Sequence, residues 1–465
     1  MTSTLYFKFP TKIAALLTLL TLASGSILAQ TAADYLNEGF TRRKAGDIDG
    51  AIADYSKAIE LMPDYAQAYY DRGFARSLKK DLDGAIADYT KCIEIVPDFV
   101  KPYNNRGLVR SSKGDFDGAI ADFTKAITLK PSDPGAYSNR GLVKEKKGDY
   151  DGAVADFSKA IEVEPGSAKA YSNRGLVKDR KGDYDGAIAD FTKAIQYQPY
   201  DPSAYSNRGL SKFHKQDLTG ALADFNQSAQ LQPGNPGTYS NLALVRGANG
   251  DLDGAIADYS KAIKMTPREA NLYINRANTK SVKSDYKGAI DDYTIAIQLQ
   301  PENSLIYLSR GHLYYIQHRF KDALPDYEKA TTLNPPDEYS QFFLWLIRAR
   351  LGQKSAATNE LQKYLEYHHA KDTGDWPSRI SRFLSGQLTE AELFKAADNP
   401  DPRTADFLFC ESRFFSGTVH LINGDTTDAA TDFNQCIEKS SPDFREYQTV
   451  VSELQFLESG KPNKK

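Results

Sequence analysis

The chain has 465 residues, of which 41% are apolar and 26% charged, so the disordered and membrane-embedded classes are excluded. Its 58 basic and 61 acidic residues leave a formal charge of -3, without the basic excess of a dedicated nucleic-acid binder. Three cysteines in a chain of this length exclude a scaffold held together by disulfides.

Residues 1–29 have the pattern of a secretory signal peptide. Lys8 and Lys12 supply positive charge, an apolar run over 13–23 follows, and Ala29 is a small residue suited to cleavage. The run is too short to cross a hydrocarbon core, which takes about 20 residues. We therefore expect an exported protein, periplasmic or secreted, with no membrane span after cleavage. A signal kept as an uncleaved anchor is the alternative.

A unit of 34 residues is copied nine times without insertion over residues 32–337. Its signature ADYSKAIELMP at 53–63 returns as ADYTKCIEIVP at 87–97 and ADFTKAITLKP at 121–131. The presence of 28 tyrosines beside only two tryptophans reflects the same copying. A period of 34 residues predicts an array of helix–turn–helix units. The predicted repeats are 32–65, 66–99, 100–133, 134–167, 168–201, 202–235, 236–269, 270–303 and 304–337.

The repeat 168–201 illustrates how one unit is built. Its first helix is predicted around 169–181 and ends at Gly182-Asp183, a helix stop followed by a capping acid. A second helix with one apolar stripe follows, and Pro199 ends it. Helices of about 13 residues are marginal alone, so we expect the array to be stabilised by stacking of neighbouring units.

These features resemble the tetratricopeptide repeat family. A large aromatic residue lies early in each first helix, and a small residue follows four positions later. Unit one also has the family's second-helix residues, as Ala51, Tyr55, Ala58 and Pro63. The resemblance implies an all-α, right-handed solenoid of antiparallel helix pairs, with the aromatic positions in its core. Those positions are Tyr35, Tyr69, Tyr103, Tyr137, Tyr171, Tyr205, Tyr239, Tyr273 and Tyr307, and the small residues are Gly39, Gly73, Gly107, Gly141, Gly175, Gly209, Ala243, Ala277 and Gly311.

An arginine replaces the family's leucine before the small residue in seven of the nine units, and every unit keeps an aspartate in its second helix. We predict that each arginine pairs with an aspartate of its own or the adjacent unit, because an unpaired, half-buried guanidinium group is costly. A basic stripe that binds phosphates is the alternative. The predicted structural ion pairs join Arg106, Arg140, Arg174 and Arg208 to Asp122, Asp156, Asp190 and Asp224.

An asparagine lies beside the aromatic position of most first helices, which line the concave groove in this fold family. One interpretation is a ladder of amide groups that binds the backbone of a protein or peptide partner. The other is that these asparagines hold neighbouring units in register through local hydrogen bonds. The candidate partner-binding residues are Asn105, Asn139, Asn173, Asn207, Asn241 and Asn275.

The period breaks after Pro335-Pro336, and residues 338–465 form a separate helical module. A degenerate repeat is predicted near 410–443, and we interpret the module as a cap, because an array needs a final unit with a polar outer face.

The same module resembles the carboxy-terminal part of the NlpI family of periplasmic repeat lipoproteins. The matching stretches are FLWLIRARLGQ at 343–353, FLSGQLTEAEL at 383–393 and FFSGTVHLINGDTTDAATDF at 414–433. The resemblance implies an adaptor for envelope proteases and cell-wall hydrolases that has no catalytic groups of its own.

No sequence motif indicates catalysis, a cofactor or a metal ion. A glycine-rich phosphate loop is absent, and none of the six histidines forms the i, i+4 pair that binds zinc on a helix. Cys410 and Cys436 belong to the final predicted helix pair, where a disulfide and two buried thiols are both open interpretations.

We therefore expect an exported adaptor or scaffold that binds a protein or peptide in its concave groove, without catalysis and without nucleic acid. A self-associating structural or assembly protein of the cell envelope is the first alternative. A cell-wall enzyme or glycan binder is the second.

Overall fold

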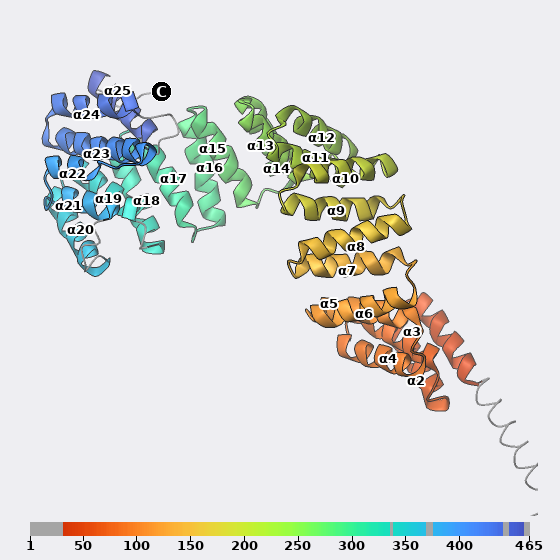
Figure 1. The fold of residues 1–465 in the computed structure, drawn as a ribbon. Coiled ribbons are helices and arrows are strands. Elements are labelled where there is room, and N and C mark those ends of the chain that lie inside the picture. Colours follow the sequence, from red (N-terminus) through yellow and green to blue (C-terminus); the bar gives the residue numbers. More distant parts are fainter. Residues whose placement is uncertain (1–30, 335–337, 369–374, 440–445, 460–465) are drawn as a thin grey trace, which may run out of the picture. The chain divides into compact units, whose positions relative to one another are not determined.

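A computed structural model describes residues 31–334, 338–368, 375–439 and 446–459, all of it helices joined by turns and short connections. The predicted signal peptide and the break at Pro335-Pro336 lie outside these residues. The chain divides into two compact units, Met1–Gln232 and Pro233–Lys465, and each is described by itself. The described helices are consecutive antiparallel pairs (Figure 1), as the predicted all-α solenoid requires.

The first unit contains six repeats, each with a first and a second helix packed against each other. The first helices are residues 31–44, α3 (Ala66–Leu78), α5 (Val100–Ser112), α7 (Pro134–Lys146), α9 (Ala168–Arg180) and α11 (Pro202–His214). The second helices are α2 (Ile48–Leu61), α4 (Leu82–Ile95), α6 (Phe116–Leu129), α8 (Tyr150–Val163), α10 (Tyr184–Tyr197) and α12 (Leu218–Leu231).

The second unit contains three further repeats and the carboxy-terminal module. The repeat helices are α13 (Pro236–Ala248), α14 (Leu252–Met265), α15 (Ala270–Val282), α16 (Tyr286–Leu299), α17 (Ser304–Tyr315) and α18 (Phe320–Leu333). The module consists of α19 (Glu338–Arg350), α20 (Lys354–His368), α21 (Trp376–Leu384), α22 (Glu390–Ala396), α23 (Pro402–Asn423), α24 (Thr426–Lys439) and α25 (Tyr447–Ser459).

Helix α23 begins eight residues before the predicted degenerate repeat. Asp401 caps it by accepting a hydrogen bond from the Thr404 backbone N–H, and Pro402 occupies the first turn. Proline is well tolerated there, because the first backbone N–H groups of a helix have no partner within the helix. The residues Asn399 and Pro400 lie in the short connection that precedes this long helix.

The turn between α9 and α10 shows why the helices end where they do. Gly182 has a φ of +79°, a left-handed conformation that favours glycine over other residues. The next residue, Asp183, accepts a hydrogen bond from the Gly186 backbone N–H and so caps α10. The same aspartate cap begins each second helix from α2 to α16.

Within a repeat, the most enclosed aromatic ring belongs to the second helix. Phe191 of α10 is fully buried, and a Cβ atom added to Gly175 of α9 would lie 2.9 Å from its ring. A small residue at position 175 therefore lets the two helices approach closely. The equivalent rings in the other repeats, which are all buried, are Tyr55, Tyr89, Phe123, Phe157, Phe225, Tyr259, Tyr293 and Tyr327.

The first-helix tyrosines are less buried than the sequence predicted. Only Tyr103 and Tyr273 are buried, and the other seven are half-buried. The reason is their position at the edge between repeats: the Tyr205 hydroxyl donates to the Pro199 carbonyl oxygen of the preceding repeat at 3.2 Å. The guanidinium carbon of Arg208 lies 5.7 Å from the centre of the same ring.

In the ranges that the structure describes, no helix is both long and apolar enough to cross a membrane.

Candidate functional site

The first helices of the first unit form a continuous surface, which we call the first-helix face. Helix α3 contacts α5, α5 contacts α7, α7 contacts α9 and α9 contacts α11. In the sequence, one second helix separates the two helices of each of these contacts. Side chains that recur at one position of these helices are therefore arranged in rows along the face. Such a surface can hold an extended partner.

A cavity of about 510 Å³ opens on this face near its amino-terminal end. Aromatic and long polar side chains from three successive first helices surround it. The residues that line it are Leu36, Asn37, Phe40, Arg43, Gln67, Tyr70, Asp71, Phe74 and Lys101.

Asp71 is the buried charge of this cavity, with 8% of its surface exposed. The Gln67 side-chain amide donates to its Oδ2 atom at 2.7 Å, and a terminal nitrogen of Arg43 lies 4.0 Å from Oδ1. Burial raises the pKa of Asp71, and these two neighbours oppose the rise. Arg43 also lies over the rings of Phe40 and Phe74, at 5.2 and 5.0 Å from their centres. The cavity thus offers apolar walls beside groups that hydrogen-bond.

The second unit has two cavities at equivalent first-helix positions. One of about 300 Å³ is lined by Leu244 and the candidate residue Asn275, among others. Another, of about 520 Å³, is lined by Leu308, His312 and Phe343 together with polar residues of α17 and α19. Burial lowers the pKa of His312 to about 4, so its imidazole is neutral at pH 7.

A row of exposed apolar side chains lies beside the asparagines, and sequence reasoning missed it. These residues come three positions after the asparagine, or after Asp71 in the second repeat, so each lies almost one helical turn further along the same helix. Four of them are strongly exposed: Phe40 (42%), Leu108 (46%), Leu176 (36%) and Leu244 (46%). The 34-residue period contains the signal, but a leucine in a helix is by default assigned to the core. We call Phe40, Phe74, Leu108, Leu142, Leu176 and Leu210 of the first unit the apolar row, and Leu244 is the equivalent residue in the second unit.

All six candidate asparagines are half-buried on first helices. The Asn105 amide donates to the Tyr70 hydroxyl of the preceding repeat at 3.2 Å. The Asn173 side-chain nitrogen is buried and has no hydrogen-bond partner among the described residues. Asn275 lines a cavity. The structure therefore gives one of the six a contact that bridges repeats, and gives another an unsatisfied donor.

The structure places each predicted arginine against the aspartate of its own repeat. The Nη2–Oδ1 distances are 2.7, 2.6, 2.6 and 2.7 Å for the pairs Arg106–Asp122, Arg140–Asp156, Arg174–Asp190 and Arg208–Asp224. In each pair Nε also donates to Oδ2, which makes the contact bidentate. Arg72, Arg276 and Arg310 make the same contact.

The same guanidinium groups also reach the preceding repeat. Nη1 of Arg174 donates to the Ser158 hydroxyl of the previous second helix at 2.9 Å. The other six arginines contact a serine or threonine at the equivalent position. Each arginine therefore joins three helices, and each of its three guanidinium nitrogens donates to a group within the protein.

A second cation completes the surroundings of the aspartate in six of these seven repeats, and Asp326 is the exception, because Tyr314 stands at the position of the cation. Lys178 lies one helical turn after Arg174, and its Nζ atom is 2.8 Å from Oδ2 of Asp190. Thus Oδ2 of this buried carboxylate accepts from two positive groups. Lys144, Lys212 and Lys280 do the same in their repeats, and Arg76 and Arg110 replace lysine in two others.

Cys410 and Cys436 are both buried, and the structure forms no disulfide between them. The Cys410 thiol donates to the Cys436 carbonyl oxygen at 3.4 Å, and the contact between the two cysteines lowers the pKa of Cys410.

The solved structures that are similar to this chain each match only part of it. The crystal structure of MamA protein has 27% sequence identity, with 37% of this chain and 94% of that chain covered and a TM-score of 0.35. YrrB, described as a TPR protein with an unusual peptide-binding site, has 23% sequence identity and a TM-score of 0.36. The match covers 40% of this chain and 97% of YrrB. A tetratricopeptide repeat protein from Parabacteroides merdae has 20% sequence identity and a TM-score of 0.43. The match covers 54% of this chain and 99% of that protein. No curated protein matches the chain.

Family models agree with the 34-residue period. A model described as TPR repeat matches residues 39–79 and 109–148. Models described as tetratricopeptide repeat match 66–99, 134–167, 168–201, 240–304 and 274–338. Together these matches cover more than half of the chain. The protein therefore belongs to the tetratricopeptide repeat family, whose repeats are protein-interaction modules.

Proposed function

We propose that this protein is an exported adaptor that binds an extended protein or peptide partner along its first-helix face and catalyses no reaction itself. The observation that carries the proposal is the apolar row beside the asparagines. An extended peptide presents backbone amides and side chains at regular intervals. Asparagine amides can hydrogen-bond the backbone, while neighbouring exposed leucines take apolar side chains.

The cavity around Asp71 gives this face an anchoring point. Tight partners are held chiefly by a few buried apolar or aromatic side chains. Phe40 and Phe74 supply apolar walls for such a side chain, and Lys101 and Gln67 supply donors for its backbone. An apolar residue of the partner is therefore the group that this cavity best accommodates.

Two features of the sequence support an envelope location for this adaptor. Residues 1–29 have the charge and apolar pattern of a signal peptide. Residues 343–353, 383–393 and 414–433 resemble the NlpI family. On this proposal the partner is an envelope enzyme, a protease or a cell-wall hydrolase, which the adaptor holds.

Photo-crosslinking tests the proposed binding face. A photoreactive amino acid is placed at Leu108 or Leu176 in cells that make the protein, and at Lys125 as the matched control. Lys125 is exposed on the second helix α6. We expect one recurrent crosslinked protein from positions 108 and 176 and none from position 125. Equal crosslinking from all three positions would reject the first-helix face as the binding surface.

Fractionation of the same cells tests the location. We expect the protein in the envelope fraction, with residues 1–29 absent from the purified protein. Its retention in the cytoplasm would contradict the proposed export and leave the binding face to be judged by the crosslinks alone.

A further inference from the structure

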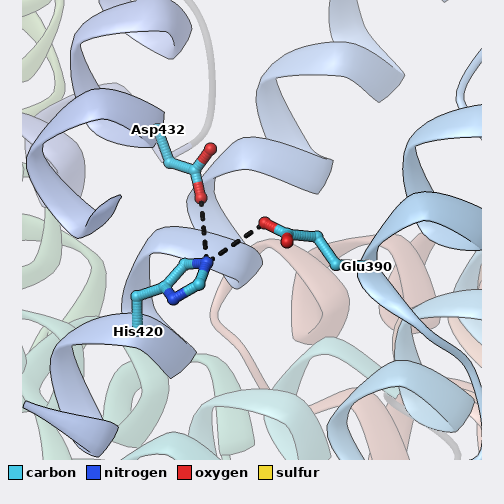
Figure 2. Close-up of side chains that lie close together, drawn as sticks. All are labelled: Glu390, His420 and Asp432. Carbon is cyan, nitrogen blue, oxygen red and sulfur yellow. Dashed lines mark hydrogen bonds and ion pairs between the residues drawn. The ribbon is translucent and has the colours of Figure 1, made fainter. Parts of the chain in front are cut away.

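Three side chains from different helices of the carboxy-terminal module converge in one place (Figure 2). Glu390 begins α22, His420 lies on α23 and Asp432 lies on α24. The Nε2 atom of His420 is 3.1 Å from Oε1 of Glu390 and 3.9 Å from Oδ2 of Asp432. One atom from each residue lies within 4.8 Å of the other two.

The degenerate repeat explains why this cluster formed. A Cβ atom added to Gly417 would lie 2.8 Å from the Phe433 ring, the same close approach that Gly175 makes to Phe191. In this register Asp432 corresponds to Asp190. Ser416 therefore occupies the position of Arg174, and His420 occupies the position of Lys178.

Asp432 consequently lacks the lysine or second arginine that six of the seven arginine-paired aspartates have, and the Nε2 atom of His420 lies 3.9 Å from its Oδ2 atom instead. Its side chain is 5% exposed, like that of Asp190. Arg413, from one turn earlier, contacts Oδ1 at 2.7 Å. The Oδ2 atom is buried and has no hydrogen-bond partner among the described residues. A buried carboxylate oxygen without a donor is rare in folded proteins, and a bound cation would satisfy it.

We propose that Glu390, His420 and Asp432 bind a zinc ion, through Oε1, Nε2 and Oδ2. One imidazole and two carboxylates form a ligand set that Zn²⁺ accepts, with water in the fourth position. Ligand atoms at about 2.0–2.2 Å from a tetrahedral ion lie about 3.3 Å apart. The distances of 3.1 and 3.9 Å from the His420 nitrogen bracket that separation, so small side-chain movements complete the site.

The net charge of the cluster and the neighbours that orient its side chains both favour a divalent cation. Glu390 and Asp432 carry two negative charges, and Arg413 neutralises one of them, so the cluster retains a net negative charge for the ion. The other ring nitrogen of His420 lies 4.0 Å from Oδ2 of Asp425, which can orient the ring. The Ser416 hydroxyl donates to Oε1 of Glu390 at 2.5 Å and so fixes this carboxylate. The ion would tie α22 to the α23–α24 pair.

The competing arrangement holds no metal, and the Nε2 atom of His420 then simply hydrogen-bonds Oε1 of Glu390 at 3.1 Å. Zinc titration of the purified protein, after treatment with a chelator and removal of that chelator, separates the two. We expect one Zn²⁺ per chain by calorimetry and a rise in the Tm of the second unit on zinc addition. No saturable zinc binding would overturn the proposal.

Two substitutions assign the binding to this cluster. His420→Gln and Glu390→Gln each remove a ligand, and circular dichroism shows whether the helices are retained. Loss of an outer-shell partner alone costs about 10–100-fold in metal affinity, so we expect each variant to lose at least that much. His214→Gln is the matched control, because His214 lies 3.6 Å from the single carboxylate of Asp179. Equal binding by His420→Gln and His214→Gln would overturn the assignment.

X-ray absorption at the zinc edge provides a readout that does not depend on the variants. We expect one imidazole nitrogen and otherwise oxygen ligands at about 2.0–2.2 Å. Sulfur ligands at about 2.3 Å would place the ion on Cys410 and Cys436 and overturn the proposed site.

Discussion

Arg174 and Asp190 meet through two parallel hydrogen bonds between the helices of one repeat. Nε lies 2.9 Å from Oδ2, and Nη2 lies 2.6 Å from Oδ1. The third guanidinium nitrogen reaches Ser158 of the preceding repeat. One side chain thus connects the inside of a repeat with its junction to the neighbour, and seven repeats share the arrangement.

Replacing Arg174 by leucine, the residue typical of the family, should destabilise this repeat. The Asp190 side chain is only 5% exposed and would keep Lys178 as its one cation. Removing one partner of a buried ion pair lowers the free energy of unfolding by about 3–5 kcal/mol. Because Lys178 remains beside Asp190, we expect a decrease of about 3 kcal/mol. Hydrogen exchange of α9 and α10 amides measures the change locally.

A double-mutant cycle with Asp190→Asn isolates the interaction. We expect a coupling energy above about 1 kcal/mol, because the two groups share a bidentate contact. Arg180→Leu is the control, since Arg180 is 57% exposed and pairs with Glu145 on the neighbouring first helix. That change should cost below about 1 kcal/mol. Additive effects for Arg174 and Asp190 would show that the pair contributes no specific stability.

Replacing Asn139, Asn173 and Asn207 together by alanine should weaken binding of the crosslinked partner. Each amide contributes about 1 kcal/mol if it hydrogen-bonds the partner backbone, so the triple variant should lose about 100-fold in affinity. Calorimetry with the purified partner measures this loss.

The same variant distinguishes the two interpretations of these asparagines. Asn173 has a buried donor without a partner among the described residues, and its removal should leave the Tm almost unchanged. Asn105→Ala is the comparison, because Asn105 contacts Tyr70 of the adjacent repeat. A large drop in Tm for the triple variant, with affinity preserved, would favour the register role.

The second unit should lose stability as the pH falls from about 6.5 to about 4. Burial lowers the pKa of His312 to about 4 in the folded protein. Between the two values the unfolded chain binds a proton that the folded chain does not, so acid favours unfolding. The full shift in the His312 pKa corresponds to about 3 kcal/mol in the free energy of unfolding. Because the His312 ring is partly accessible, we expect a smaller decrease.

His312→Leu should remove this pH dependence. Leucine is present at the equivalent first-helix position in other repeats, among them Leu142 and Leu244. Thermal unfolding of both proteins at pH 7 and pH 4.5 tests the assignment. If the Tm of the variant drops between pH 7 and pH 4.5 as much as that of the unmodified protein, groups other than His312 cause the acid sensitivity.

None of the three cysteines should react with a thiol reagent while the protein is folded. Cys92, Cys410 and Cys436 are each at most 1% exposed, and burial raises the pKa of Cys92 to about 12. The thiolate is the reactive form, so burial slows the reaction of all three thiols by blocking access, and the raised pKa slows that of Cys92 further. We expect three reactive thiols after unfolding without reductant. A count of one would show that Cys410 and Cys436 form a disulfide.

The repeat array is encoded by signals that act over a few residues. Gly182 adopts the left-handed turn and Asp183 caps the following helix, both by local geometry. The predicted bounds of 169–181 differ by one residue from the observed α9 (Ala168–Arg180). The copied period then identifies which faces meet, because every repeat packs against a near-copy of itself.

The exposure of individual side chains was less predictable. A tyrosine and a leucine on the same first helix both look like core residues, yet Tyr171 is half-buried and Leu176 is exposed. Burial depends on how closely the adjacent repeat approaches, which the sequence of one helix does not contain. Only the packing of successive first helices therefore shows that the side chains of the apolar row are exposed.

By itself, the sequence determined the helix pairs, their ends and the residues that recur in register, because capping, turns and periodicity are local or repeated. Only the tertiary structure decided that Arg174 joins three helices, and that Glu390 meets His420 and Asp432. The carboxy-terminal module contains one degenerate repeat, α23 and α24, and no period relates α22 to that repeat. Contacts across 30 residues there depend on how α22, α23 and α24 pack, and a single sequence carries no direct record of that packing.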